Sequence, residues 1–401
     1  MKRASNLYDK ITNLKLIKTM YDKRVKLNTK NKLKIEKFDE YYSSNILRIK
    51  EILDSKNYKP GKYNLFLIKE PKVRLIMSQN IPDKIINHLV SQYFLVDVFD
   101  KCLIEENVAT RINKGTHYGV KKLKQYLKNN IDEKLYVLKF DITKYFFNLD
   151  HNVLKKIIRK KIKDKEALKI LDTIIESTDD DYINKEIVRL KQREILKLKK
   201  SNAVNKEQLI EDINQIPLCK KGKSAPIGNM SSQAFAIIYL NELDHYIKEV
   251  LKPGLYIRYQ DDGLLVSKNK EYLKQCLKEI DVIVRKYKLN LNRKTRIYSL
   301  DEGFEFLGFK YIKKNNKLIM KIKNQTKKRF KRKMNKLYKL YIKGIIEITD
   351  VNQVKASYLG HLRYGNTNNL IKSVINRYEK DKYMDYGKTV IIKLNGELEI
   401  K

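Results

Sequence analysis

The feature that most constrains the fold is a pair of adjacent aspartates, Asp261 and Asp262, in the segment YIRYQDDGLLVS at residues 256–267. Apolar residues precede and follow this pair, which predicts a strand, a tight turn and a second strand. Gly263 relaxes the backbone near the turn. Adjacent carboxylates repel each other, and burial on a sheet removes their hydration. The hairpin therefore predicts an oxygen-rich site for Mg²⁺ or Mn²⁺, with a solvated acidic turn as the alternative.

A third carboxylate, Asp141, ends the strand predicted in KLYVLKFDITKYF at residues 134–146. Two metal ions held about 3.5–4 Å apart need an acid from a neighbouring strand in addition to the first pair. Taken singly, Asp141 is better explained as the N-cap of a following helix. Its position at the end of an apolar strand makes it the candidate for the third acidic ligand.

The charge balance predicts a polyanionic partner. The 401 residues include 87 Lys and Arg against 47 Asp and Glu, a formal net charge of +40, which favours nucleic acid. A membrane surface is the weaker alternative, because no apolar run of about 18 residues is present and the N-terminus lacks the core of a signal peptide. Cys102, Cys219 and Cys276 show no metal-site spacing and are expected to be reduced thiols. We expect a soluble, intracellular protein.

Periodicity and turn residues divide the remaining chain into helices and hairpins. Residues 1–60 are predicted to be helical, and residues 62–79 form a hairpin that turns at Glu70-Pro71 and carries Lys69, Lys72 and Arg74. Further helices are predicted at 82–99, 118–129, 231–251 and 271–288, helices and loops in the basic stretch 152–222, and strands at 304–312 and 317–323.

The character of the sequence changes after residue 323. A helix capped by Asn324 or Thr326 is predicted, with an apolar stripe formed by Phe330, Met334, Leu337 and Tyr341. Lysines and arginines crowd its other faces, which suits contact with a nucleic-acid backbone, although a merely solvated face is the alternative. The C-terminal segment TVIIKLNGELEIK predicts a hairpin with a turn at Asn395-Gly396.

Five segments resemble, in order, the motifs of the reverse transcriptase family, and the similarity extends from about residue 60 to about residue 370. They are FDITKYFFNLDH, APIGNMSSQAFAIIYLNELD, YQDD, LNLNRKT and FLGF. The resemblance implies an α+β fold, a right-handed polymerase with fingers, a palm of antiparallel sheet plus helices, and a helical thumb. The implied domains are 1–135 for the N-terminal helices and fingers, 136–323 for the palm with a basic insertion around 152–222, 324–384 for the thumb, and 385–401 for a hairpin tail.

The same resemblance implies roles for individual residues. Asp141, Asp261 and Asp262 are the implied catalytic residues, and with Ile142 they would bind two Mg²⁺ or Mn²⁺ ions. The implied nucleotide-binding residues are Lys72, Arg74, Phe146, Gly228, Gln233 and Lys294. Lys72 and Arg74 would hold the triphosphate, and Lys294 would place a cation near the leaving phosphate. The ring of Phe146 would exclude a 2′-hydroxyl, with ordinary core packing as the alternative. Arg111 resembles a template-contact arginine of the family.

The implied activity is that of an RNA-directed DNA polymerase in the bacterial cytoplasm, with an RNA template, a DNA or RNA primer and deoxynucleotides as partners. A non-coding RNA or an accessory protein is a further candidate partner. Ile227-Gly228, followed by Ser232-Gln233, resembles the enzymes of diversity-generating retroelements and of some bacterial antiviral-defence systems. One alternative is an RNA-templated RNA polymerase, which Phe146 disfavours. The other is a catalytically silent nucleic-acid-binding scaffold, which the intact acids disfavour.

Overall fold

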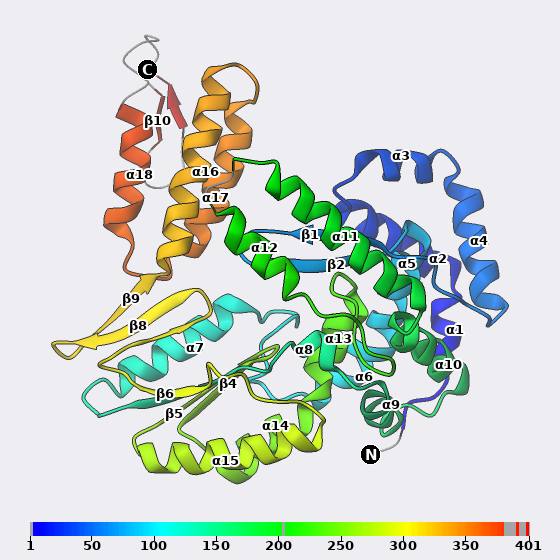
Figure 1. Cartoon of the computed structure of the whole chain (residues 1–401), viewed down its shortest axis with the longest axis horizontal. Helices are drawn as coiled ribbons and strands as arrows, with labels where there is room; N and C mark the ends of the chain where they lie inside the picture. The colour runs from blue at the N-terminus through cyan, green and yellow to red at the C-terminus, as the bar shows by residue number, and fades with distance from the viewer. Residues whose placement is uncertain (1–2, 203–204, 381–389, 393–397, 401) are drawn as a thin grey trace. The chain divides into compact units, whose positions relative to one another are not determined.

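The structure is a computed structural model that describes residues 3–202, 205–380, 390–392 and 398–400 (Figure 1). The chain divides into two compact units. The first contains Met1–Gly115, Leu138–Leu265 and Lys274–Arg296, and the second contains Thr116–Val137, Val266–Leu273 and Ile297–Lys401. Helices and antiparallel strands are mixed throughout, which confirms the α+β prediction. Among the described helices, none has both the length and the apolar character needed to cross a membrane.

The first unit begins with helices, as predicted for residues 1–60. They are α1 (Tyr8–Ile11), α2 (Leu14–Met20), the π-helical η1 (Tyr21–Lys26), α3 (Lys32–Asp39) and α4 (Tyr42–Asp54). The Asn13 side chain accepts hydrogen bonds from the backbone N–H groups of Lys15 and Leu16 and so caps α2. In α4, Ile46, Ile49 and Leu53 are buried at helical spacing. A side-chain cap therefore supports α2, whereas α4 depends on the burial of its apolar face.

The predicted hairpin consists of β1 (Asn64–Ile68) and β2 (Arg74–Ser78), which pair antiparallel. Leu65 lies opposite Met77, and Leu67 lies opposite Leu75. Leu65, Leu75 and Met77 are buried, whereas Phe66 and Ile68 on the other face are exposed. The hairpin therefore has one apolar face that must be covered by another part of the chain.

A four-stranded sheet carries the aspartates, with the strand order β4-β5-β3-β6. Its strands are β3 (Tyr136–Phe140), β4 (Leu255–Tyr259), β5 (Asp262–Ser267) and β6 (Arg296–Ser299). The sequence prediction missed β6. Four consecutive residues are buried in β4 and again in β5, so both faces of these strands are covered.

The helix predicted at residues 231–251 is divided. It consists of α13 (Met230–Tyr239), α14 (Asn241–His245) and the π-helical η5 (Tyr246–Leu251), with Leu240 outside the helical region at φ −101° and ψ 19°. The Ile237 carbonyl accepts hydrogen bonds from Asn107 Nδ2 at 3.2 Å and Arg258 Nη2 at 2.8 Å. Since these side chains satisfy a carbonyl near the helix end, the chain can leave the helix there at little cost.

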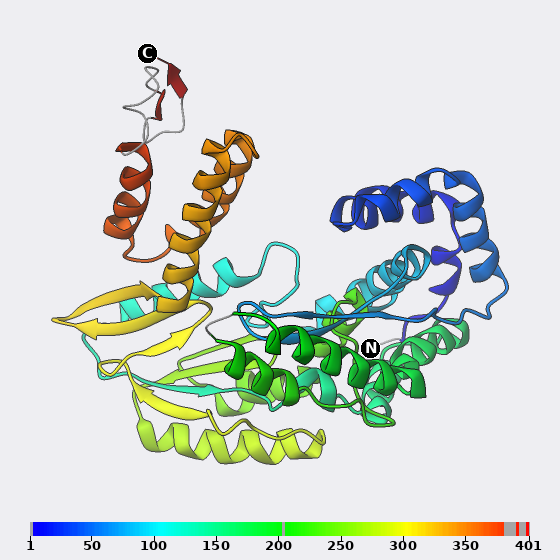
Figure 2. The same cartoon turned by 45° about the horizontal axis from the view of Figure 1, so that its top comes forward.

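The remaining helices of the first unit agree with the predicted helical stretches, except for two short ones at residues 100–102 and 145–148 that were not predicted. They are α5 (Ile81–Val90), η2 (Ser91–Val96), α6 (Asp97–Phe99), η3 (Asp100–Cys102), α8 (Tyr145–Asn148), α9 (His151–Arg159), α10 (Lys165–Ile175), η4 (Glu176–Thr178), α11 (Asp181–Lys199), α12 (Lys206–Asn214) and α15 (Lys270–Lys286). Helices α11 and α12 lie along the β1–β2 hairpin in both views (Figures 1 and 2).

The second unit combines a small sheet with helices. Its described elements are α7 (Thr116–Asn129), β7 (Phe304–Phe306), β8 (Phe309–Lys314), β9 (Lys317–Ile322), α16 (Asn324–Ile342), α17 (Ile348–Leu362), α18 (Asn368–Lys380), β10 (Val390–Ile392) and β11 (Leu398–Ile400). Strands β7, β8 and β9 form an antiparallel sheet in that order. Strands β10 and β11 pair antiparallel as predicted, whereas the predicted turn at Asn395-Gly396 lies outside the described residues.

Helix α16 differs from the prediction at both ends. It begins at Asn324 after Lys323, and no side chain caps it, so the proposed caps Asn324 and Thr326 were wrong. Phe330, Met334 and Leu337 are buried as predicted, together with Tyr338, whereas Tyr341 is exposed. The buried stripe packs against residues of α17 and α18 such as Val351, Leu362 and Val374, and the contact ends one turn before the helix does.

Candidate active site

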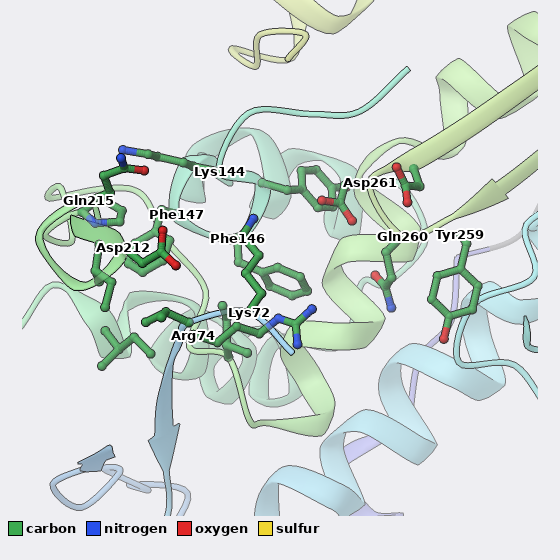
Figure 3. Close-up of a pocket in the computed structure, with 17 residues that line it drawn as sticks. Lys72, Arg74, Lys144, Phe146, Phe147, Asp212, Gln215, Tyr259, Gln260 and Asp261 are labelled. Atoms are coloured by element: carbon green, nitrogen blue, oxygen red, sulfur yellow. The ribbon is translucent and has the colours of Figure 1, made fainter. Parts of the chain in front are cut away.

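A cavity of about 520 Å³ in the first unit is lined by the predicted site residues Lys72, Arg74, Phe146, Asp261 and Asp262 (Figure 3). Five segments line it: the β1–β2 hairpin, the chain after β3, the chain at the end of α12, the chain before α13, and the β4–β5 turn. The lining residues discussed below are Lys72, Arg74, Lys144, Phe146, Asp212, Gln215, Ile227, Gln260, Asp261 and Asp262. Acidic, basic and aromatic side chains therefore face one space.

Asp141 and Asp261 are brought together by neighbouring strands. Asp141 directly follows β3, and Asp261 lies in the tight turn that connects β4 to β5, where Gln260 has a positive φ of 58°. Because β3 and β5 are adjacent in the sheet, the carboxyl groups of Asp141 and Asp261 lie close enough to share a hydrogen bond.

The environment of these acids disfavours negative charge. Burial raises the pKa of Asp261 to about 7, and the charges of Asp141 and Asp262 act in the same direction. Burial and the charge of Asp262 also raise the pKa of Asp141, while the nearby Lys139 and Lys72 oppose that change. Three carboxylates in this space would be stabilised by an added cation.

Gly263 is required by packing more than by turn geometry. A Cβ atom at this position would lie 2.1 Å from Cζ of Phe140, the residue that precedes Asp141. The positive φ of the turn belongs to Gln260. The absence of a side chain at Gly263 therefore lets β5 approach β3 closely enough for the acids to meet.

Asp262 is placed differently from the other two acids. Its Oδ1 atom lies 3.5 Å from Nζ of Lys139, and no group of three or more His, Cys, Asp or Glu side chains in the described part of the chain is arranged to hold a metal ion. The carboxylate oxygens nevertheless are the donors that Mg²⁺ and Mn²⁺ prefer. The donor set therefore fits divalent ions, provided that Asp262 exchanges its lysine partner for a cation.

Lys72, Arg74 and Phe146 line the same cavity as Asp261 and Asp262, and Asp141 adjoins it through its contact with Asp261 (Figure 3). Lys72 is close enough to lower the pKa of Asp141. The backbone at Phe146 is fixed, because its carbonyl accepts a hydrogen bond from Ala225 N at 2.7 Å and the hydroxyl of the adjacent Tyr145 donates to Ala236 O at 2.7 Å. Phe146 therefore presents its partly buried ring to the cavity from a rigid segment.

The other predicted residues do not line the cavity. Gly228 has φ 125°, and a Cβ there would lie 3.0 Å from Ile76 Cγ2 and 3.2 Å from the Met77 carbonyl, so it permits contact with β2. Gln233 is partly buried on α13, and Lys294 is exposed. The segment around Lys294 is joined to the acids, since Asn292 N donates to Asp141 O at 2.7 Å.

Two further predicted residues have mainly structural contacts. The buried Ile142 forms an antiparallel bridge with Leu291, and its predicted metal contact stays a prediction. The Arg111 guanidinium donates to Asp100 Oδ1 and to the Ile104 carbonyl, both at 2.6 Å. Arg111 therefore closes an internal loop, and its contact with a template also stays a prediction.

Sequence reasoning missed a buried ion pair beneath the aspartate turn. Arg258 Nε and Nη2 donate to the two carboxylate oxygens of Asp244, each at 2.6 Å, and neither side chain is exposed. Arg258 Nη1 also donates to the Gln260 carbonyl at 2.6 Å. The pair therefore holds the backbone next to Asp261. Its sequence signal was a lone arginine inside the apolar strand before the aspartates.

Comparison with known proteins agrees with this geometry. A family model described as reverse transcriptase (RNA-dependent DNA polymerase) matches residues 59–311. The matched region includes the hairpin, the acids and every residue that lines the cavity. A search of curated proteins found no match to the chain.

Proposed function

The chain belongs to the reverse transcriptase family, and on this basis we propose that it is an RNA-directed DNA polymerase that adds deoxynucleotides to a primer 3′-hydroxyl on an RNA template. The observation that carries the proposal is the contact of Asp141 with Asp261, which lines a cavity together with Lys72 and Arg74. Nucleotidyl transfer needs both acidic side chains, which bind metal ions, and basic side chains, which bind the phosphates of the nucleotide.

In the proposed mechanism, Asp141, Asp261 and Asp262, with the Ile142 carbonyl, would hold two Mg²⁺ or Mn²⁺ ions. Such ions, when bound, activate the attacking hydroxyl and stabilise the leaving pyrophosphate. Lys72 and Arg74 bind the triphosphate, for which the forked guanidinium of Arg74 offers paired hydrogen bonds. The Arg258–Asp244 pair keeps Asp261 in position through the Gln260 carbonyl.

The acid assignment is tested with Asp261→Asn. We expect primer extension on poly(rA)/oligo(dT) with Mg²⁺ or Mn²⁺ to fall at least a thousandfold, because one acidic ligand is lost, while affinity for the primer and template is retained. Asp301→Asn, in an exposed turn, is the matched control and should extend normally. Near-normal extension by Asp261→Asn would disprove the assignment. Inactivity of the wild type as well would favour the silent scaffold.

The preference for deoxynucleotides is tested at Phe146. If its ring lies beneath the incoming sugar, Phe146→Ala should admit ribonucleotides by removing a clash. A loss of about 2.7 kcal/mol of discrimination would change the ratio of the two kcat/KM values about a hundredfold. Each nucleotide is measured singly on one primer and template. An unchanged ratio would leave Phe146 as a packing residue, and a wild type that prefers ribonucleotides would favour an RNA polymerase.

We further propose that the enzyme serves a bacterial retroelement of the diversity-generating type or an antiviral defence system. The support is the residue pattern Ile227-Gly228 followed by Ser232-Gln233. Ile227 lines the cavity. Its apolar side chain therefore faces the proposed nucleotide and offers it no hydrogen bond. The genes beside this one provide the test: a template and variable repeat pair supports the retroelement, and a cluster of defence genes supports the antiviral role.

A further inference from the structure

We propose that the α11–α12 segment is a clamp that positions the β1–β2 hairpin for nucleotide binding, and that the ion pair between Lys69 and Glu194 is its polar contact. The inference rests on the proposed function, because it assigns these two residues a role in placing Lys72 and Arg74. Neither Lys69 nor Glu194 lines the cavity, so they are positioning residues.

The apolar face of the hairpin is covered by the clamp. Leu65, Leu75 and Met77 form one buried cluster with residues of α11, α12 and the chain that follows. The buried members from this second group are Ile183, Ile187, Leu190, Leu198, Ile213, Ile216 and Cys219. A two-stranded hairpin is marginally stable alone in water, so this contact supplies much of its stability.

Polar contacts fix the alignment of the two parts. Lys69 Nζ lies 2.9 Å from Glu194 Oε2 near the tip of the hairpin, and the Glu194 side chain is only 13% exposed. At the start of the hairpin, Tyr63 N donates to the Tyr182 hydroxyl at 2.8 Å. Glu194 therefore contacts the hairpin at its turn, from which Lys72 and Arg74 lead into β2.

The clamp is itself fixed and reaches the cavity. Lys191 Nζ donates to the Ile216 carbonyl at 2.7 Å, which ties α11 to the chain after α12. Asp212 and Gln215, from the end of α12, line the cavity with Lys72 and Arg74, and Figure 3 shows them beside Phe147 and Lys144. The same segment thus supports the hairpin from outside and forms a wall of the cavity.

The hairpin is also anchored at its other end. Met77 N donates to the Ile227 carbonyl at 2.9 Å, and the missing side chain of Gly228 allows that approach. With β2 held at Met77 and the tip held at Lys69, the residues between them have little freedom. Lys72 and Arg74, which bind the triphosphate, are therefore already in position, and this reduces the entropy lost on binding.

The test reverses the charge at Lys69 in the full-length protein. Lys69→Glu should raise the KM for deoxynucleotides about tenfold and change kcat less than twofold, because binding is weakened equally in the ground and transition states. Amide hydrogen exchange in residues 64–78 should accelerate. The double variant Lys69→Glu/Glu194→Gln should recover part of both effects, because it removes the repulsion between two carboxylates without placing a new cation beside Lys197 and Arg193. Lys185→Glu is the matched control, since Lys185 is exposed on α11 nine residues before Glu194, and it should change neither.

Each outcome decides the proposal. Unchanged exchange and unchanged KM in Lys69→Glu would overturn it, as would faster exchange with no change in KM, a fall in kcat alone, or no recovery in the double variant. The exchange measurement needs no catalysis. If the wild type extends no primer, the proposed function fails, whereas protection of the hairpin that depends on the ion pair would still demonstrate the clamp.

Discussion

At the scale of single residues, the buried pair of Arg258 and Asp244 fixes the backbone of the turn that carries Asp261. Asp244 also accepts hydrogen bonds from the Tyr256 hydroxyl at 2.7 Å and from Asn107 Nδ2 at 3.1 Å. All of these groups are buried, so removing one charge leaves the other without compensation. The pair therefore links the stability of the fold to the position of Asp261.

We expect Arg258→Leu to lower the free energy of unfolding by about 3–5 kcal/mol, because Asp244 would keep a buried charge without its partner. Arg285→Leu provides the matched control. Arg285 pairs with Asp281 at 2.8 Å, but its side chain is 69% exposed, so the cost should be about 0–1 kcal/mol. Urea denaturation of both variants measures the difference, and equal losses would contradict this account.

The sequence could predict the acids because they follow apolar strands, a local pattern that is visible in a few residues. Arg258 was not predicted as structural, since its partner lies 14 residues earlier and nothing local indicates that both charges are buried. Lys139 was missed for a similar reason. Its contact with Asp262 depends on the pairing of β3 with β5, which no local pattern specifies.

At the scale of secondary-structure elements, α5 makes the stability depend on pH through His88. Burial lowers the pKa of His88 to about 4, and the charges of Arg24 and Lys84 act in the same direction. The unfolded chain binds a proton near pH 6.5, whereas the folded chain does so only near pH 4. The contribution of His88 is therefore fully present above pH 6.5 and is lost as the pH falls toward 4.

We expect the free energy of unfolding of the wild type to fall more steeply than that of His88→Gln between pH 7 and pH 5. The difference between the two proteins should change by about 2 kcal/mol over this range, because each pKa unit corresponds to about 1.4 kcal/mol. Urea denaturation at several pH values measures it. Parallel pH profiles would show that His88 is not shielded from protonation in the folded state.

Elements were predicted more completely than their contacts. The β1–β2 hairpin follows from alternating apolar residues and the aspartate hairpin from the apolar residues on both sides of the acids, and both hairpins are present. The basic stretch at 152–222 was predicted as helices and loops without a role. Its packing on the hairpin joins residues such as Tyr63 and Tyr182, which are 119 positions apart, and periodicity within one helix cannot identify a distant partner.

At the scale of the whole molecule, the net charge of +40 is partly concentrated on α16. Lys336, Lys339 and Lys343 line a shallow groove of about 320 Å³. If the groove follows a nucleic-acid backbone, these lysines contact phosphates and release counterions on binding. The affinity should therefore depend steeply on salt and little on sequence.

We expect replacement of Lys336, Lys339 and Lys343 by Gln to reduce the slope of log K against log salt by about 2–3 for an RNA–DNA duplex. The matched control replaces Lys32, Lys34 and Lys37 of α3 by Gln, which removes the same total charge and should leave the slope nearly unchanged. Binding titrations at four salt concentrations measure both slopes. Equal reductions would mean that net charge, not the α16 groove, sets the affinity.

The packing of α11 and α12 on the hairpin also has a consequence for synthesis on the ribosome. Tyr63 emerges 119 residues before its partner Tyr182, an interval of roughly 6–24 s at about 5–20 residues per second. Throughout that time Leu65, Leu75 and Met77 have no cover from the chain that will bury them. The nascent N-terminal region is therefore where a ribosome-associated chaperone would be needed, and slower translation would lengthen the exposure.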